Sequence, residues 1–314
     1  MVEKQNVELK LIHMEDVVSK EVEWLWYPYI PYGKITIIEG DPGEGKTTLV
    51  LKLAAALSRG LPLPCDDDKE YEPIHIIYQT AEDGIEDTIK PRLEKAGADC
   101  SMIQVIDETD KELSMTDDRL EQAIIETRAR LIILDPIQAY IGATVDMHRA
   151  NEIRPVLKHL GIIAEKHNCA IILIGHMNKA TARSVLLVAR IRDKTNIRII
   201  AHDKSSLAPA GDAIGFEMTE DNGMVCIGPY DITIDELLSG NEGRGKKKLD
   251  IAENFIKEYF GTNKMIPSNE IMVEAAKRSI KRNTLLSAKK KLGITSDKEK
   301  AEDGTIYWTW VMPE

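Results

Sequence analysis

The sequence predicts an α/β fold with a doubly wound, mainly parallel β-sheet, followed by a small C-terminal unit. Between about residues 35 and 200, apolar runs of strand length alternate with longer segments of helical periodicity. Most of these runs are nearly unbroken stretches of Ile, Leu and Val, as expected for parallel strands covered on both faces. The expected strands are Ile35–Glu39, Ile74–Gln79, Met102–Ile106, Leu131–Leu134 and Ala170–Gly175, and the expected helices are Lys46–Ser58, Ile85–Ala96, Asp117–Arg128 and Arg149–His167.

The composition indicates a folded, acidic protein with a basic C-terminal part. The chain of 314 residues is 43% hydrophobic and has a formal net charge of −11, which argues against disorder and against a protein coated in nucleic acid. Residues 244–314 contain 15 Lys and Arg against 10 Asp and Glu, a net charge of +5, so residues 1–243 carry −16. This split favours an acidic enzymatic body with a basic appendage.

The cellular compartment and the domain boundaries are predicted from cysteine spacing, from the N-terminal residues and from a segment rich in Gly and charge. The four cysteines are far apart in the sequence, without metal-ligand spacing, and the N-terminus has no apolar leader. We therefore expect reduced thiols and a cytoplasmic protein. Strand-like pieces recur after residue 200, and residues 239–248 (SGNEGRGKKK) are rich in Gly and charge, which is typical of a linker. We expect a large domain over residues 1–238, a linker over 239–248 and a small domain over 249–314.

A phosphate-binding loop is predicted directly after the first strand. Gly40–Thr47 matches G-x-x-x-x-G-K-[ST] between an apolar strand and a helix, which is the context that the motif requires. The alternative is a chance Gly-rich turn, which these flanks disfavour. Lys46 is expected to reach the β- and γ-phosphates, and the Thr47 hydroxyl to ligate Mg²⁺. ATP is therefore expected to bind at Gly40, Asp41, Pro42, Gly43, Glu44, Gly45, Lys46, Thr47 and Thr48.

A carboxylate at the end of a second apolar strand is a candidate magnesium ligand. Asp135 follows Leu131–Leu134, and a strand buried on both faces leaves this side chain at the ligand edge of the sheet. The alternative is that Asp135 caps the turn before Pro136, which the nearby phosphate-binding loop makes the minority interpretation.

Hydrolysis also needs a group that orients or deprotonates water. Glu82 follows the strand Ile74–Gln79 and is our candidate base, with Asp83 as the runner-up. Either carboxylate could instead cap the next helix, although Thr80 or Asp83 suits that role better than Glu82. At a third strand end, His176 is a candidate sensor of the γ-phosphate, although a lone His is more often structural.

Together these residues resemble the RecA-like ATPases of the plasmid RepA helicase type, relatives of the DnaB replicative helicases. The similarity covers about Glu21–Ile227 and includes WLWYPYIPYGKITIIEGDPGEGKTTL, YQTAEDG, LIILDPIQAYIG, IILIGHMNKA, ARSVLLVAR and KSSLAPAGDAIGFE. The resemblance implies that Glu82 activates water and that His176 corresponds to the strand-end His of the family. It also implies that Lys204 reaches the γ-phosphate of a neighbouring subunit in a hexameric ring with ATP sites between subunits.

The chain departs from this family after the HMNKA segment. The family usually carries a longer loop with an Arg-Gly-Ser-Ile-Asp-like stretch that faces the central channel. Here Ala180 runs almost directly into Thr181–Ser184, so either the loop is lost or a stretch is missing from the sequence. A ring channel is accordingly the weaker candidate for DNA contact. An aromatic cluster before the first strand is expected to pack on the core, with base stacking by one ring as the alternative.

The C-terminal residues have the element order of a winged helix. We expect helices over Asp250–Phe260, Ser268–Lys277 and Lys281–Lys291, with Ser268 as an N-cap, and a hairpin over Gly293–Val311. Basic residues of the third helix would contact DNA phosphates, and the alternative is a solvated basic face on a protein-docking module. These residues are Lys281, Arg282, Lys289, Lys290 and Lys291.

The sequence therefore predicts a ring-forming P-loop ATPase that couples ATP hydrolysis to work on DNA, as a replicative helicase of a mobile element or phage. The alternative is a DNA-binding regulator that ATP switches without unwinding. A small-molecule kinase is disfavoured, because no Arg-rich lid is evident and a winged helix has no role in such an enzyme.

Overall fold

The structure is a computed structural model. It describes residues 9, 11–66, 69–142, 145, 149–175, 182–219, 223–239, 243–261, 263–278, 280, 282–300 and 306–313. Three features singled out in the sequence lie outside the described residues: the candidate sensor His176, the junction Ala180–Thr181, and Lys281.

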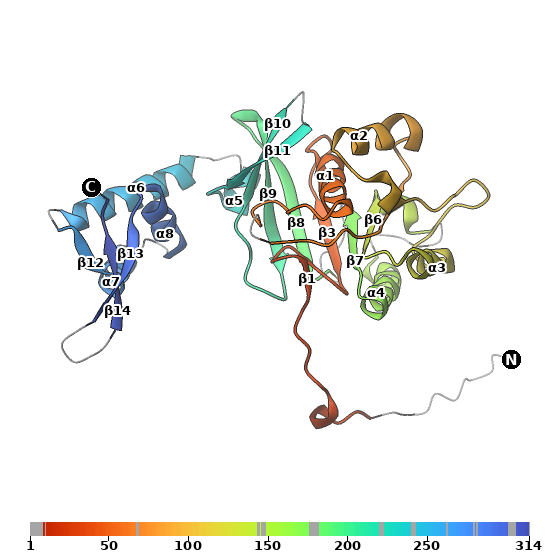
Figure 1. The fold of residues 1–314 in the computed structure, drawn as a ribbon, viewed down its shortest axis with the longest axis horizontal. Coiled ribbons are helices and arrows are strands. Elements are labelled where there is room, and N and C mark those ends of the chain that lie inside the picture. The colour runs from red at the N-terminus through yellow and green to blue at the C-terminus, as the bar shows by residue number, and fades with distance from the viewer. Residues whose placement is uncertain are drawn as a thin grey trace.

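Within these residues, a nine-stranded sheet forms the centre of the large part (Figure 1). Its strand order is β11-β10-β9-β8-β3-β7-β6-β4-β5. The strands from β8 to β5 run parallel to their neighbours, and β9, β10 and β11 extend the sheet antiparallel beyond β8. The strands are β3 (Ile35–Glu39), β4 (Ile76–Thr80), β5 (Ile103–Gln104), β6 (Leu131–Asp135), β7 (Ala170–Ile174), β8 (Ser184–Ile191), β9 (Lys194–Ser205), β10 (Ile214–Thr219) and β11 (Gly223–Pro229).

Helices cover both faces of the parallel strands, so the predicted doubly wound α/β sheet is confirmed. Alternate residues of β6 enter two cores: Leu131 and Ile133 pack with α1, whereas Ile132 and Leu134 pack with α3 and α4. This two-sided burial explains the unbroken apolar strands. The helical segments are η1 (Met14–Asp16), α1 (Lys46–Ser58), the π-helical η2 (Ile85–Ile89), α2 (Lys90–Lys95), η3 (Cys100–Met102), α3 (Asp118–Thr127), η4 (Ile137–Tyr140), α4 (Ala150–His167) and α5 (Ile234–Ser239).

Most elements match the predicted ranges, and the differences have local causes. Strand β3 and helix α1 have the predicted bounds. The predicted helix Ile85–Ala96 is instead a π-helical turn followed by α2, with Pro91 in the first turn of α2. Pro lacks an N–H and its ring clashes with the preceding turn, which disfavours a regular helix from Ile85 through Pro91 and suits Pro91 to the first turn of α2. Strand β8 was not predicted, because the predicted pattern alternates strands with helices, and no helix separates β7 from β8 among the described residues.

Two of the aromatic residues before β3 belong to the core, whereas Tyr27 is 56% exposed. Strands β1 (Trp24–Trp26) and β2 (Ile30–Pro31) pair, and Trp26 and Tyr29 are both buried. Trp26 Nε1 donates to the Pro64 carbonyl at 3.1 Å, while Tyr29 stacks on His202 with ring centroids 5.0 Å apart. These contacts fix the hairpin on the sheet, in agreement with the packing interpretation.

Two cysteines lie close together as reduced thiols. The Sγ atoms of Cys65 and Cys226, distant in the sequence, are 3.9 Å apart, and Cys65 is exposed. No helix among the described residues is long and apolar enough to cross a lipid bilayer.

The C-terminal elements have their own core, which includes Phe255, Phe260, Leu285 and Trp310. Residues 243–248 of the expected linker are the first turns of α6, since Lys and Arg are good helix formers. Helix α7 begins at Ser268 after an N-cap at Pro267 without a side-chain cap bond, so the predicted cap is wrong. The elements are α6 (Gly243–Phe260), β12 (Met265–Pro267), α7 (Ser268–Lys277), α8 (Arg282–Lys291), β13 (Thr295–Lys300) and β14 (Ile306–Val311), with sheet order β12-β14-β13.

Candidate nucleotide-binding site

The loop between β3 and α1 has a backbone that only glycine can form at its ends. Gly40 has φ +148°, and a Cβ there would lie 2.0 Å from the Val188 carbonyl oxygen of β8. Gly45 has φ +93° and is the N-cap of α1. Glycine alone adopts such conformations without steric cost. The two motif glycines therefore let the chain turn tightly into the N-terminus of α1, where backbone N–H groups are available to an anion.

Lys46 lies folded over this loop. Its Nζ donates to the carbonyl oxygens of Gly40 at 2.6 Å and Asp41 at 2.9 Å. Burial lowers the pKa of Lys46, and nearby carboxylates, Asp135 first among them, act in the opposite direction. An ammonium group thus lies at the mouth of the loop, beside the positive end of the helix.

Asp135 and Thr47 meet where the loop approaches the end of β6. Thr47 Oγ1 donates to Asp135 Oδ2 at 2.7 Å, and Tyr78 Oη donates to the same oxygen at 3.0 Å. Asp135 is 8% exposed, and burial raises its pKa while the two hydrogen bonds lower it. The observed partners of its carboxylate are therefore groups of the candidate site. The turn after Pro136 has no side-chain cap.

Tyr78 is a site residue that the sequence reasoning missed. It lies in β4 beside β6 and is fully buried, so its hydroxyl must find a hydrogen-bond partner inside the protein. A tyrosine that follows Ile76–Ile77, two residues before the end of the strand, was the signal that could have revealed it.

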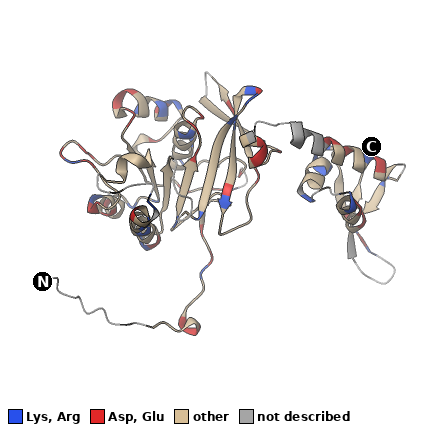
Figure 2. Ribbon diagram, turned by 180° about the vertical axis from the view of Figure 1, so that it is seen from behind, with Lys and Arg blue, Asp and Glu red and all other residues tan. Residues whose placement is uncertain are grey.

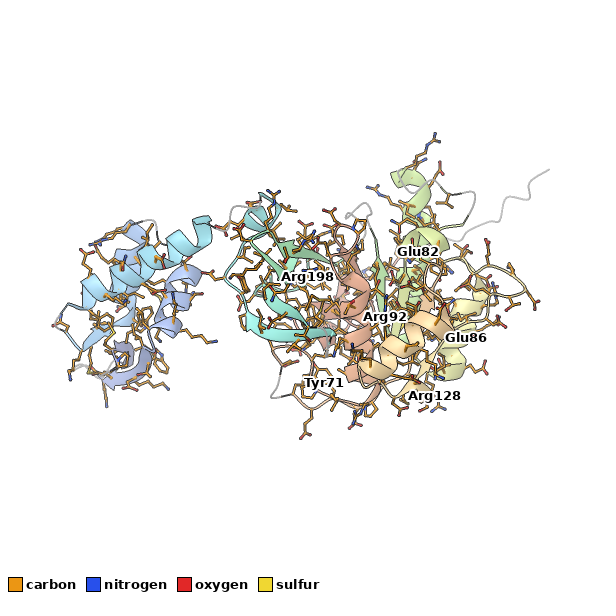
Figure 3. The ribbon with its side chains drawn as sticks, turned by 90° about the horizontal axis from the view of Figure 1, so that it is seen from above. Tyr71, Glu82, Glu86, Arg92, Arg128 and Arg198 are labelled. Carbon is orange, nitrogen blue, oxygen red and sulfur yellow. The ribbon has the colours of Figure 1, made fainter. Side chains whose placement is uncertain are left out.

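Glu82 and Asp83 follow β4 but have different environments. Asp83 is half-buried, its N–H donates to Thr80 Oγ1 at 3.3 Å, and its carboxylate pairs with Arg92 at 3.4 Å. Glu82, labelled in Figure 3, is exposed and raises the pKa of Lys46. Both carboxylates raise the pKa of Asp135, Asp83 more than Glu82. Asp83 thus has a structural role in the turn, which leaves Glu82 as the better candidate base.

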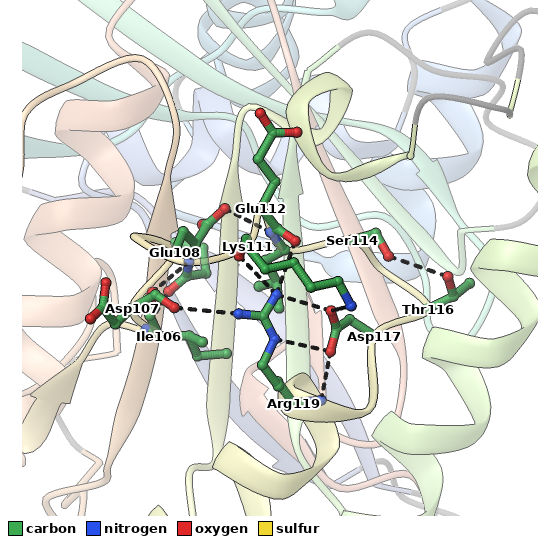
Figure 4. Close-up of polar contacts among 11 residues, drawn as sticks. Ile106, Asp107, Glu108, Lys111, Glu112, Ser114, Thr116, Asp117 and Arg119 are labelled. Carbon is green, nitrogen blue, oxygen red and sulfur yellow. Dashed lines mark hydrogen bonds and ion pairs between the residues drawn. The ribbon is translucent and has the colours of Figure 1, made fainter.

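The loop after β5 supports the end of β4. Gln79 Oε1 accepts from the Ile106 N–H at 2.6 Å, and its Nε2 donates to Glu108 at 2.6 Å. Figure 4 shows Arg119 at the centre of this loop, where its side chain binds Asp117 and three backbone carbonyls. Hydrogen bonds from Arg119 hold the pKa of Asp117 well below its usual range. The loop after β5 therefore holds the end of β4, which precedes Glu82, in place through the hydrogen bonds of Gln79.

Glu44 connects the loop to the antiparallel strands, a contact that the motif did not predict. It is 7% exposed and forms ion pairs with Arg190 of β8 at 3.3 Å and Arg198 of β9 at 3.8 Å. A pocket of about 540 Å³ adjoins it, lined in part by Gly40, Asp41 and residues 187–190. This volume is within the range of small-molecule sites, which is about 300–1,000 Å³.

Lys204 does not join the site of its own chain. Ile200 of β9 pairs with Val188, beside the loop. Lys204 pairs with Val185, nearer the start of β8 and away from the loop. The four residues from Ile200 to Lys204 span about 13 Å at the rise of a β-strand.

Residues 6–182, more than half of the chain, match the model of a protein family described as an AAA domain. The chain belongs to this AAA-domain family. It is also similar to proteins named DNA repair protein RadA. That of Halalkalibacterium halodurans is 27% identical over 241 residues (73% of this chain, 48% of the relative). Those of Bacillus subtilis and Streptococcus pneumoniae are 25% and 24% identical over 224 and 223 residues, covering 67% of this chain and 44% and 48% of the relatives.

The chain spans about half the length of the curated relatives it matches. The family, the fold and the geometry of the loop agree: this AAA-family protein is an ATPase of the RecA-like P-loop class. Membership of this class implies nucleotide binding.

The basic residues predicted on the third C-terminal helix are only partly available. Lys291 pairs with Glu253 of α6 at 2.5 Å, and Lys289 lies over the buried Trp310 ring with Nζ 4.9 Å from the centroid. Arg282 and Lys290 are exposed. Acidic and basic residues lie side by side in this unit (Figure 2), so α8 is not a uniformly basic face.

Proposed function

We propose that the protein hydrolyses Mg²⁺-ATP at the loop Gly40–Thr47 and couples hydrolysis to work on DNA. The observation that carries the nucleotide part is the 2.7 Å contact between Thr47 Oγ1 and Asp135 Oδ2. It brings the hydroxyl of the phosphate-binding loop to a buried carboxylate at the end of β6, two strands along the sheet from β3. This is the arrangement that a magnesium-nucleotide requires in P-loop enzymes.

The residues present fit a magnesium ion. Mg²⁺ prefers oxygen ligands and usually binds through one or two protein groups together with phosphates and water. Thr47 and Asp135 would hold it, and the bound ion would neutralise charge on the β- and γ-phosphates.

The remaining groups have separate roles in the proposed reaction. Backbone N–H groups of the loop bind the β-phosphate, and Lys46 exchanges its loop carbonyl partners for phosphate oxygens. Glu82 orients the attacking water and accepts its proton. Tyr78 fixes the orientation of Asp135 and favours its ionised form.

A ring is part of the proposal. The position of Lys204, about 13 Å along β9 from the residue beside the loop, supports contact with the nucleotide of a neighbouring subunit rather than its own. A hexamer with ATP sites between subunits would bring such a lysine to the γ-phosphate, and His176 would sense the same group. Mass measurement in solution with and without ATP tests this assembly.

DNA is the proposed partner, and two observations support it. Three relatives are named DNA repair proteins, and residues 244–314 have a net charge of +5. We propose the division into residues 1–238, 239–248 and 249–314, in which residues 243–248 connect the parts as the first turns of α6 and the last part is a winged-helix-like domain that binds DNA. A replicative helicase role follows from the resemblance to RepA-type proteins, and cytoplasmic location stays a prediction.

Two other functions remain as competitors. Similarity to RadA favours work on DNA during repair, and an ATP-switched regulator would bind DNA without unwinding it. ATP-driven strand separation on a forked duplex tests the helicase. Separation that requires ATP hydrolysis supports it, whereas ATP-dependent binding without separation contradicts it and favours the regulator.

A further inference from the structure

The β13–β14 hairpin carries an exposed aromatic ring next to a lysine. Trp308 is 49% exposed, and Lys298 lies directly opposite it in the antiparallel register. Lys298 Nζ is 5.0 Å from the centroid of the Trp308 ring. By contrast, Trp310 is 2% exposed and belongs to the core of the unit. Packing in the core therefore explains the presence of Trp310 but not that of the half-exposed Trp308.

The pleat of β13 separates its charges. Side chains two residues apart in a strand point to the same face, so Ser296, Lys298 and Lys300 share one face. Asp297 and Glu299 point to the other. Through the register, the face of Lys298 is also that of Trp308 and Trp310. A strand with mixed sequence charge thus presents a basic and aromatic surface on one side only.

This surface continues onto α8. Lys289 of α8 donates from its Nζ to Ser296 Oγ and lies over the Trp310 ring. The last turn of α8 is therefore joined to the hairpin face. We call Ser296, Lys298, Lys300 and Trp308 the hairpin surface, to which Lys289 joins the last turn of α8.

The chemistry of this surface matches a nucleotide strand. An exposed indole stacks on a base whose face is open, and a lysine beside it pairs with the adjoining phosphate. Bases in a duplex are stacked on one another, so an open base face belongs to an unpaired strand. The net charge of +5 over residues 244–314 favours a polyanion over a neutral partner.

We propose that the hairpin surface binds single-stranded DNA, with Trp308 stacked on an unpaired base and Lys298 and Lys300 on the flanking phosphates. This proposal rests on the proposed work on DNA and assigns the contact to the hairpin rather than to α8. The contacts of Lys289 and Lys291 within the protein are the reason, since they remove two of the lysines expected on the helix.

Fluorescence anisotropy of a labelled oligothymidylate, titrated with the full chain, tests the assignment. Trp308→Ala should weaken binding roughly tenfold or more, because one stacked base is lost, whereas Trp308→Phe should keep most of the affinity. Lys298→Ala should weaken binding and reduce the slope of log affinity against log salt by about 1. Val273→Ala removes an apolar side chain of α7 that is 58% exposed and should change nothing.

The possible outcomes separate the proposal from the function on which it rests. If the wild-type chain binds no DNA at low salt, the proposed work on DNA fails. If the wild type binds but Trp308→Ala binds equally well, or only Arg282→Ala and Lys290→Ala weaken binding, the hairpin assignment is wrong. Equal affinity for a fully paired duplex, or equal displacement by polyglutamate, would overturn base stacking. Circular dichroism of the two Trp308 variants checks that each is folded.

Discussion

The edge of the large sheet and the C-terminal unit use charged residues in opposite ways. Where the strands end near the phosphate-binding loop, three charged residues are each less than 9% exposed: Glu44, Asp135 and Arg198. Glu44 pairs with Arg198, and Asp135 accepts a hydrogen bond from Thr47. In the C-terminal unit, Arg282 and Lys298 are exposed on a small fold. Burying a charge is costly unless it is paired, so buried charges persist where their position matters.

Mutations in the two parts should therefore differ in the size of their effect, on the rate of hydrolysis in one part and on DNA affinity in the other. Phosphoryl transfer depends on positioning and on electrostatic stabilisation at the reacting phosphate. Binding of a polyanion instead sums many similar contacts, each of modest strength. Loss of a side chain that acts directly on the reacting phosphate or water should therefore slow the reaction by orders of magnitude, whereas loss of one exposed lysine should only weaken binding.

Lys46→Ala should have the largest effect. Removal of the ammonium group that we propose binds the γ-phosphate should lower ATP turnover by about 10³-fold or more. Steady-state phosphate release measures this, and Lys52→Ala on the same helix, outside the loop, is the matched control. Turnover in Lys46→Ala close to that of the wild type would remove the basis for the nucleotide site.

Glu82→Gln should come next. Loss of the base should reduce turnover by about 10²–10³-fold while ATP still binds, because no contact of the loop is changed. Nucleotide binding and single-turnover hydrolysis separate the two effects. Asp83→Asn is the comparison: if it, rather than Glu82→Gln, stops turnover, the base is misassigned.

The third prediction concerns the pH dependence of stability that a buried histidine of the large part causes. Residues 244–314 contain no histidine, so the C-terminal unit cannot contribute this dependence. His202 is 9% exposed, its Nδ1 accepts from the Gly211 N–H at 2.9 Å, and burial lowers its pKa from 6.5 to about 4. Folding therefore favours the neutral ring. The folded state should lose roughly 3 kcal/mol of stability as the pH falls from about 6.5 to about 4.

Urea unfolding at several pH values measures this loss. His202→Gln should flatten the dependence in this range, and unfolding of the C-terminal unit should not show the histidine contribution. An unchanged pH dependence in the variant would mean that the His202 ring is not held neutral in the folded protein.

Tyr78→Phe should have the smallest effect on turnover. Asp135 would lose one of two donors that favour its ionised form, so its pKa should rise further. Turnover should fall about tenfold, and the acid limb of the pH–rate profile should move to higher pH, with a greater Mg²⁺ requirement. An unshifted acid limb would show that Tyr78 only fills space.

The sequence predicted the parts of the fold that depend on local pattern. Buried parallel strands and the glycines of Gly40–Thr47 have strong signatures, and Asp135 was placed correctly beside Thr47 because parallel strand ends meet at one edge. Tyr78 and the partners of Glu44 were missed, because they depend on contacts between strands distant in the sequence. The basic residues of α8 were overestimated, since composition does not show that Glu253 pairs with Lys291.

The most direct test measures ATP turnover and DNA affinity together in the wild type, Lys46→Ala and Trp308→Ala. We expect ATP turnover and DNA affinity to be lost in different variants. Lys46→Ala should lose turnover but keep its affinity for single-stranded DNA without nucleotide, and Trp308→Ala should keep basal turnover but lose affinity and stimulation by DNA. A wild-type protein that hydrolyses no ATP in the presence of Mg²⁺ and single-stranded DNA would contradict the account.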